Sequence, residues 1–495
     1  MPKKSMIFLL TFLLLWAGIC AAQEQTKTEK EVEYFAIFLN NQKIGHSVHT
    51  RTAEPDKVTN TDQVSISISR LGVVISINAT ETTIETPEGK PLAFESVIEN
   101  LGLMNSKTQK TGKINDQGNL EITTIDRTTK KETIDWPEGA LMSEGAELLA
   151  KKKGLKEGVT YSIKLFTPDM SSLFADVDVK VGPTKEIDLL GRVVSLTEVT
   201  TTTKLLNIPI VSTEYLDKEF DVQKSITPLL GMNMEIVACD KAFALSESDP
   251  ADFLDRFLLP SPSPIENVKS AESITYHLTP LEKEKLDIPA SDQQTVRTDE
   301  TGNILVTVKP ISPSTGVSIP YKGKDPKILQ ALEPTQFLQS DDEEIIALAQ
   351  KAVGETTDAA QAAQKIEKFV YDYIDEKNLA VGYATAVEVL ESRQGDCSEH
   401  AVFTAAMCRA VGLPAQVVSG MLYVDEFGGK NNVFGPHAWV QVYIGDKWIG
   451  LDATRAPNGF SAGHITLAVG SGNPEDFFGM ANTLGYFKIT KIEQK

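Results

Sequence analysis

Cysteine and histidine are scarce in this chain, which has 4 cysteines and 6 histidines among its 495 residues. They do not show the paired spacing of a structural zinc site, so a site built from Cys397, His400 and Cys408 is disfavoured. We therefore expect no metal ion and no other cofactor. Basic residues are outnumbered by acidic ones, and the formal net charge of −20 argues against binding of nucleic acid through a general basic surface.

Long apolar runs are missing after the first 22 residues, so we expect no transmembrane segment in the mature chain. At the start, Lys3 and Lys4 precede an apolar stretch at 6–19, and Cys20-Ala21-Ala22 follows. This order is typical of a secretory signal peptide, residues 1–22, because the run is shorter than the span of about 20 residues that a membrane helix needs. Cleavage after Ala22 predicts a periplasmic or secreted protein. A lipoprotein modified at Cys20 is the less favoured alternative.

Cleavage would leave three cysteines, Cys239, Cys397 and Cys408. An odd number in an oxidising compartment is consistent with one thiol that is kept free for chemistry. Cys397 and Cys408 lie about 16 Å apart on one predicted helix, at 1.5 Å per residue, which is too far for a disulfide. A bridge between Cys239 and Cys408 is an open alternative.

Alternating apolar and polar residues dominate residues 23–255, as in the stretch from Ala175 to Val181. Such a period of two predicts antiparallel strands with one buried face, and hence a large β-rich N-terminal domain. One helix is predicted to begin at Pro137 and end at Gly154. His46 and His49 are interpreted as residues of a strand surface, not as ligands.

Residues 256–335 contain Pro260-Ser261-Pro262-Ser263-Pro264, a pattern typical of a stiff linker, followed by a short β-rich segment. Helical and strand patterns then mix in residues 336–495. The whole chain is therefore predicted to be of the α+β class, with a β-rich N-terminal domain, a small middle module and a C-terminal α+β catalytic domain.

The most informative run is Gly395-Asp396-Cys397-Ser398-Glu399-His400-Ala401. Asp396 and Glu399 are spaced as an acidic capping box, which places Cys397 at the start of a helix. The predicted helix carries small and apolar residues on all its sides, so we expect it to be buried. A helix N-terminus favours the thiolate form of a cysteine, so the run predicts a reactive thiol that faces a cleft. His400 is interpreted as a residue of the helix surface or of a layer behind the site.

Two further groups follow on a predicted hairpin, whose strands 436–444 and 447–452 are joined by Gly445-Asp446. If Ile444 faces Lys447, then Trp439 faces Asp452. His437 would then lie one diagonal away from Asp452 on the same sheet face, within reach of an imidazole and a carboxylate. The pattern predicts His437 as a base and Asp452 as the acid that orients it.

Residues from about 340 to 470 resemble the transglutaminase-like superfamily. The resemblance rests on the cysteine run, the Gly-Leu-Pro-Ala turn that follows it, His437-Ala438-Trp439-Val440 and Leu451-Asp452-Ala453-Thr454. It covers about a quarter of the chain. It implies a papain-like α+β catalytic domain in which Cys397 is the nucleophile, His437 the base and Asp452 the orienting acid.

One departure from this family concerns stabilisation of the oxyanion. Transglutaminases use a tryptophan upstream of the cysteine for this purpose, and this chain has none between Trp136 and Trp439. The backbone N–H of Cys397 is available as one donor. Tyr383 is a candidate for the second. Trp439 is interpreted as a wall of the core more readily than as a substrate contact.

These patterns predict a secreted cysteine-dependent enzyme that attacks an amide of a peptide or protein and passes through a thioester. Hydrolysis, as in a protease or amidase, is favoured because the upstream tryptophan is missing. A protein-glutamine transglutaminase with an amine acceptor is the alternative. A catalytically idle binding scaffold with the same fold is the third possibility, and the sequence assigns no oligomeric state.

Overall fold

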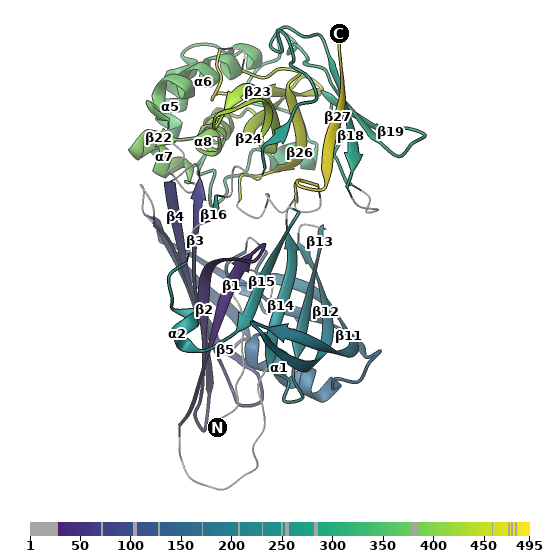
Figure 1. Cartoon of the computed structure of the whole chain (residues 1–495). Coiled ribbons are helices and arrows are strands. Elements are labelled where there is room, and N and C mark those ends of the chain that lie inside the picture. Colours follow the sequence, from purple (N-terminus) through teal and green to yellow (C-terminus); the bar gives the residue numbers. More distant parts are fainter. Residues whose placement is uncertain are drawn as a thin grey trace. The chain divides into compact units, whose positions relative to one another are not determined.

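The computed structural model describes residues 28–495 except 71–72, 102–105, 127–128, 171, 206–207, 230, 249–250, 253–256, 282–285, 378–383, 458, 474–475, 477–478 and 481–482. The predicted signal peptide therefore lies outside the described residues. The chain divides into two compact units, Met1–Ser69 with Val74–Ala251 and Asp252–Lys495 with Arg70–Val73 (Figure 1). Within the described part, no helix is long and apolar enough to cross a membrane.

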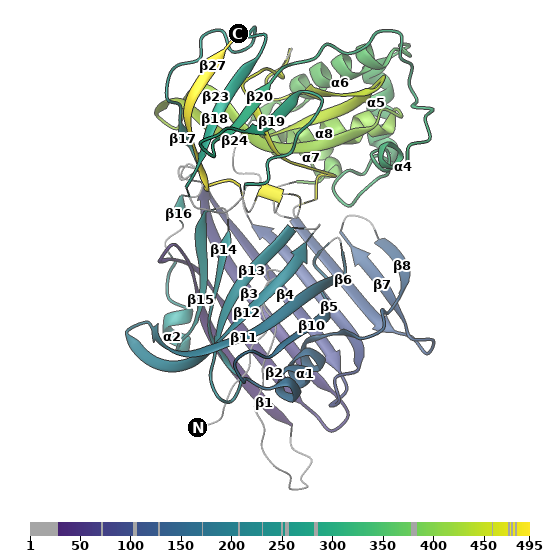
Figure 2. The ribbon, with the colours of Figure 1, turned by 90° about the vertical axis from the view of Figure 1, so that its right-hand side faces the viewer.

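The first unit is built on one large sheet whose strands lie side by side in the order β8-β7-β6-β5-β4-β3-β2-β1-β15-β14-β13-β12-β11-β10-β9 (Figure 2). Most neighbours along the chain form antiparallel hairpins, which explains the many short turns in the sequence. The strands are β1 (Glu29–Leu39), β2 (Gln42–Ala53), β3 (Val58–Arg70), β4 (Val73–Glu85), β5 (Pro91–Leu101), β6 (Ser106–Ile114), β7 (Asn119–Ile125), β8 (Thr129–Asp135), β9 (Ala140–Leu141), β10 (Thr160–Phe166), β11 (Phe174–Leu189), β12 (Arg192–Leu205), β13 (Ile208–Leu216), β14 (Val222–Leu229) and β15 (Met232–Ala238), and the short β16 spans Ala251–Asp252.

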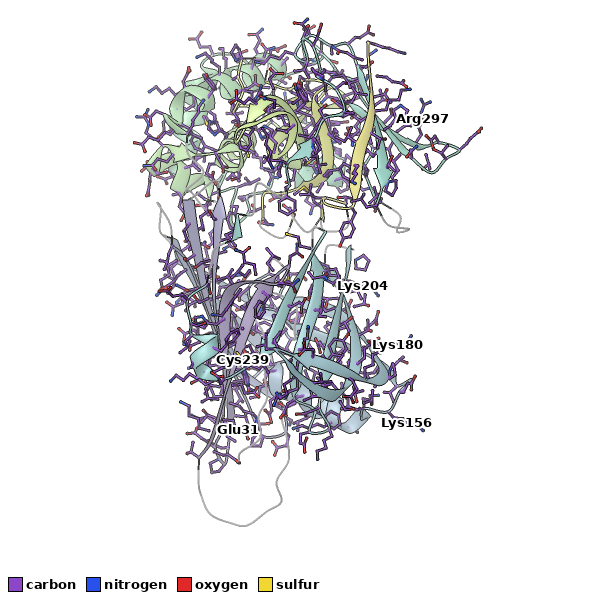
Figure 3. The ribbon with its side chains drawn as sticks, viewed as in Figure 1. Glu31, Lys156, Lys180, Lys204, Cys239 and Arg297 are labelled. Atoms are coloured by element: carbon purple, nitrogen blue, oxygen red, sulfur yellow. The ribbon has the colours of Figure 1, made fainter. Side chains whose placement is uncertain are left out.

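The alternation predicted for the first unit is present. On β11, Ala175, Val177, Val179 and Val181 are buried, and the three valines pack with Ala146 and Ala150 of helix α1 (Ser143–Lys153). The opposite face carries charged side chains, among them Lys204 of β12, whose ammonium lies 3.3 Å from the Asp178 carboxylate (Figure 3). A short helix α2 (Lys241–Ala244) follows β15.

Two predictions for this unit are wrong. Helix α1 begins at Ser143 and not at Pro137, because Ala140 and Leu141 instead pair with β10 as strand β9. His49 is not a surface residue: its side chain is buried and its Nδ1 lies 2.8 Å from Asp62 Oδ1 on the neighbouring strand. A period of two fixes which residues share a face, but it does not tell which polar residues face inward.

The second unit places helices on one side of a five-stranded sheet and a smaller sheet on the other (Figure 1). In the central sheet the order is β17-β24-β23-β26, and β25 also pairs with β24. The strands are β17 (Leu259–Pro260), β23 (Ala415–Phe427), β24 (Lys430–Ile444), β25 (Lys447–Leu451) and β26 (His464–Gly470), and the helices are α4 (Pro326–Gln330), α5 (Glu343–Val353), α6 (Ala359–Tyr373), α7 (Ala386–Ser392) and α8 (Cys397–Ala410).

Helix α8 is the centre of this unit. It packs against α5, α6 and α7 and against strands β23 and β24. All its residues from Ser398 to Arg409 are buried, as the sequence predicted. The three cysteines of the described chain are free thiols, which excludes the bridge between Cys239 and Cys408.

The proline-rich stretch at 260–264, predicted as a stiff linker, begins within a strand. Leu259 and Pro260 pair with β24 as the edge strand β17, a position that tolerates proline. The smaller sheet has the order β19-β20-β18-β27, so the predicted middle module shares a sheet with the C-terminal strand. Its strands are β18 (Ile274–Pro280), β19 (Gln294–Thr298), β20 (Ile304–Val308) and β27 (Phe487–Gln494), and a two-stranded pair joins β21 (Glu376–Lys377) to β22 (Gln394–Gly395). The domain boundaries at residues 255 and 335 stay predictions.

Buried acids in the first unit make its stability depend on pH. Glu214 on β13 is 1% exposed and neither carboxylate oxygen has a hydrogen-bond partner, so burial raises the pKa of Glu214 to about 8. The Glu214 carboxyl ionises near pH 4.5 in the unfolded chain and only near pH 8 in the folded chain. The free energy of unfolding therefore falls as pH rises across this interval.

We therefore expect Glu214→Gln to stabilise the protein at pH 8, by an amount on the order of 1–4 kcal/mol, and to change little at pH 4.5. The melting temperature measured at both pH values checks this. Glu186→Gln, at an exposed position of β11, is the matched control and should have no effect at either pH. An equal gain at both pH values would contradict the pKa argument.

Candidate active site

The start of α8 is fixed by the predicted capping box. The Asp396 carboxylate accepts the Ser398 N–H at 2.9 Å, and the Glu399 carboxylate accepts the Asp396 N–H at 2.9 Å. Glu399 also accepts the Ala384 N–H at 2.9 Å, which ties the segment before α7 to this helix. Burial and the neighbouring Asp396 raise the pKa of Glu399 to about 8. Cys397, the first residue of the helix, is partly exposed.

Strands β24 and β25 bring the other two groups to this helix start. Their register pairs Ile444 with Lys447, as predicted, and continues to Val440 opposite Leu451. His437 on β24 donates from Nε2 to Asp452 Oδ2 at 2.9 Å. The same imidazole is hydrogen-bonded to the Cys397 thiol. The three residues predicted from the sequence therefore lie together, and their catalytic roles stay a prediction.

The charges of this group favour an ion pair. Burial alone would lower the pKa of His437, but the Asp452 charge and the hydrogen bonds to Asp452 and Cys397 outweigh it and raise the pKa to about 10. Burial would raise the pKa of Asp452, but His437 and His464 outweigh it and hold that pKa well below its usual range. Near neutral pH the imidazole of His437 is thus charged. A charged imidazole beside a thiol favours the thiolate.

A second histidine, which the sequence analysis missed, contacts the same carboxylate. His464, the first residue of β26, places Nε2 at 3.1 Å from Asp452 Oδ2 and is fully buried. Burial lowers the pKa of His464, although the Asp452 carboxylate opposes this effect. The only signal in the sequence is a histidine at the head of an otherwise apolar strand, twelve residues after Asp452.

Asp452 is also held through the backbone. Its Oδ1 accepts the Thr454 N–H at 3.0 Å, and its own N–H donates to Glu367 Oε1 at 2.9 Å. Glu367 lies on α6 and is 5% exposed; it also accepts a hydrogen bond from the backbone of Gly459. This carboxylate therefore holds two points, Asp452 and Gly459, of the loop between β25 and β26, a role that no sequence pattern indicated.

Aromatic rings enclose the two imidazoles. Trp439 is 2% exposed, stacks on His437 with ring centroids 6.1 Å apart and meets His464 edge-on at 5.1 Å. Phe460 stacks on the other ring, His464, at 4.7 Å. Trp439 is thus a buried wall of the site. The other candidate contact, Tyr383, lies outside the described residues.

His400 does not lie on a helix surface. It is 1% exposed and its Nδ1–H donates to the Asp396 carbonyl at 2.6 Å, while its Nε2 is buried without a hydrogen-bond partner. Burial lowers the pKa of His400 to about 4, so the ring is neutral and Nε2 is an acceptor. It forms a layer behind the site, which was the second interpretation offered by the sequence.

His437, Asp452 and His464 also form a possible donor set for a metal. Among the histidines, cysteines and acids of the described residues, these three form a cluster whose possible ligand atoms all lie within 4.8 Å of one another. Two imidazoles and a carboxylate suit zinc, but zinc binds imidazole nitrogens that carry no proton. Here each Nε2 faces an oxygen of an ionised carboxylate, which needs an N–H donor. The observed distances therefore fit hydrogen bonds.

The model of the Transglutaminase-like superfamily matches residues 346–453. These residues form a transglutaminase-like domain. Uncharacterised proteins of Mycobacterium tuberculosis and Mycobacterium bovis are 40% identical over 76 residues, which are 14% of this chain and 24% of each relative. The chain thus spans about a quarter of the length of the curated relatives it matches.

Three solved structures are similar at low identity. A candidate cysteine protease of Cytophaga hutchinsonii is 20% identical, with coverage of 45% of this chain and 83% of that one and a TM-score of 0.29. A candidate protease of Parabacteroides distasonis is 12% identical, covering 81% and 68%, with a TM-score of 0.20. A β-barrel-like protein of Brucella abortus is 12% identical, covering 42% and 98%, with a TM-score of 0.32.

The turn before Cys397 depends on a glycine, Gly395. Gly395 has φ +150°, and an added Cβ would lie 2.3 Å from the Glu399 Cβ. We expect Gly395→Ala to destabilise the second unit by about 2–4 kcal/mol, since both the backbone and the capping box must move. Denaturant unfolding measures this loss.

The matched control is Gly429→Ala, which also has a positive φ, +76°, but has open space around the added Cβ. Its loss should be about 1–2 kcal/mol, the cost of the left-handed backbone alone. Equal losses in the two variants would show that the contact with Glu399 does not matter.

Proposed function

We propose that the chain is an exported cysteine enzyme that transfers the acyl group of a peptide or protein amide through a thioester, with water as the favoured acceptor. The observation that carries the proposal is the contact of His437 with both the Cys397 thiol and the Asp452 carboxylate, at the start of a buried helix. The match of the transglutaminase-like superfamily to this part of the chain supports it.

In the proposed reaction the Cys397 thiolate attacks the amide carbon, and a C–S bond forms. The C–N bond then breaks, and His437 gives its proton to the leaving amine, so that a thioester and a free amine result. Water next attacks the thioester, while His437 takes one of its protons. The C–S bond then breaks, which releases a carboxylic acid and restores the Cys397 thiolate beside the protonated His437.

Within this scheme Asp452 keeps the imidazole oriented and stabilises its charge without accepting the proton. The backbone N–H of Cys397 at the helix start is the proposed first donor to the oxyanion. Export rests on the predicted signal peptide at residues 1–22. The acceptor in the second step can be an amine, which would make the protein a glutamine transglutaminase.

The first test is selective alkylation of the thiols. At pH 7 we expect iodoacetamide to modify Cys397 first, because Cys408 is fully buried and burial raises the pKa of Cys239 to about 11. His437→Ala should slow the reaction of Cys397 at least about tenfold, since the charged imidazole is lost. Peptide mapping by mass spectrometry gives the three rates.

His277→Ala is the control for that variant, because His277 lies on β18 and pairs with Glu493, away from the thiol-bearing helix. It should leave all three rates unchanged. Equal labelling of the three cysteines, or a Cys397 rate that is indifferent to His437, would favour the idle binding scaffold.

The second test identifies the acceptor. The full mature chain is incubated with a library of glutamine-containing peptides, with and without an excess of a primary amine, and the products are analysed by mass spectrometry. Hydrolysis yields new carboxylic acids in both samples, whereas transglutamination yields amine adducts. We expect hydrolysis products that disappear in Cys397→Ala. Amine adducts as the main product would establish the alternative.

A further inference from the structure

One carboxylate oxygen in this site accepts hydrogen bonds from two imidazoles. Asp452 Oδ2 lies 2.9 Å from His437 Nε2 and 3.1 Å from His464 Nε2. Only His437 takes part in the proposed proton transfers. His464 is fully buried, so its place against the carboxylate needs a reason of its own.

The protonation of His464 follows from its neighbours. The ionised carboxylate only accepts hydrogen bonds, so the His464 nitrogen that faces it, Nε2, must carry a proton. The opposite nitrogen, Nδ1, lies 3.1 Å from both the backbone nitrogen and the carbonyl oxygen of Ser461; in the neutral ring it accepts the Ser461 N–H, and only a charged ring would donate to the carbonyl. Burial disfavours the charged ring. His464 is therefore a neutral side chain with its N–H fixed toward Asp452.

The sheet and the surrounding rings hold this side chain in place. Strand β23 runs between the strands of the two histidines and pairs Gly420 with His437 and Leu422 with His464, so both point to the same face. An added Cβ on Gly420 would lie 2.0 Å from the Ile465 carbonyl oxygen of β26 and 2.8 Å from the Trp439 ring, so a glycine lets the strands and this ring lie close together. The fully buried His464 ring is stacked on Phe460 at 4.7 Å and meets Trp439 edge-on at 5.1 Å.

We infer that His464 is a positioning residue of the reaction: its Nε2–H holds Asp452 Oδ2 at the place from which the carboxylate orients His437. This inference rests on the proposed function. Thr454 fixes the other oxygen, so the two donors together leave the carboxylate no freedom to rotate. Without His464, Oδ2 is held by His437 alone, and neither the carboxylate nor the His437 imidazole keeps a fixed orientation.

The test compares two substitutions in the full chain. His464→Phe keeps a ring that can stack on Phe460 but has no N–H. His464→Gln keeps an amide N–H close to the position of Nε2. We expect His464→Phe to lower the rate of Cys397 alkylation about ten- to a hundredfold, the range for loss of a hydrogen bond to a charged group, with His464→Gln recovering most of it. If His464→Phe does not fold, His464→Asn replaces it, since its shorter amide does not reach Asp452.

A merely structural role is separated by a double-mutant cycle with Asp452→Asn. If His464 acts through Asp452, the double variant Asp452→Asn with His464→Phe should be no slower than Asp452→Asn alone. Once a hydrolysed peptide is available, the loss should appear in kcat and not in KM. Rates that multiply in the double variant, or an equal loss in His464→Phe and His464→Gln, would overturn the inference.

Two controls keep the outcomes distinct. If wild-type Cys397 is unreactive, or indifferent to His437→Ala, the proposed function fails whatever the His464 variants do. If instead the isolated protein carries stoichiometric zinc that is lost in His464→Phe and whose removal by a chelator changes the alkylation rate, the trio is a metal site and the positioning role is wrong.

Discussion

The structure of the second unit depends on keeping one carboxylate charged inside a protein core. Asp452 is completely buried, and an isolated buried carboxylate would take up a proton. Three donors prevent this: the imidazoles of His437 and His464 at Oδ2 and the Thr454 N–H at Oδ1. The charge of Asp452 then raises the pKa of His437, and the charged imidazole is hydrogen-bonded to the Cys397 thiol. Each step of the proposed chemistry follows from that one anion.

The two imidazoles on Asp452 behave differently because their other sides differ. His437 is hydrogen-bonded to a thiol, and its pKa is raised to about 10. His464 is enclosed by Phe460 and Trp439, and its pKa is lowered. The positive charge of His437 adds to this lowering. Under the proposed function, this separation of the two pKa values leaves proton transfer to His437 and positioning of the carboxylate to His464.

Features coded over a few residues were predictable from the sequence. The capping box of α8 depends on Asp396 and Glu399 alone, and the parity of the β24–β25 hairpin depends on its two-residue turn. His464 was missed because it reaches Asp452 from another strand, across a loop whose path no local pattern specifies. Glu367 was missed because a glutamate on an amphipathic helix is usually solvated, and its contact with Asp452 also joins distant parts of the sequence. The place of Pro260 in a strand was not predictable, because a proline occurs both in linkers and at the edge of a sheet.

Buried groups with shifted pKa values make the stability of both units depend on pH. The low pKa of Asp452 stabilises the second unit above the ordinary carboxylate pKa near 4, and this contribution is lost as pH falls further. The first unit instead buries Glu85, with a pKa of about 7, and Glu214, with a pKa of about 8. These acids are neutral in the folded state, so their contribution is present at low pH and is lost as pH rises through 7 to 8. The second unit also loses stability as pH rises, because the pKa of Glu399 is raised to about 8 and that of His437 to about 10. Asp452 therefore makes the site sensitive to acid, whereas buried groups of both units make the chain sensitive to alkali.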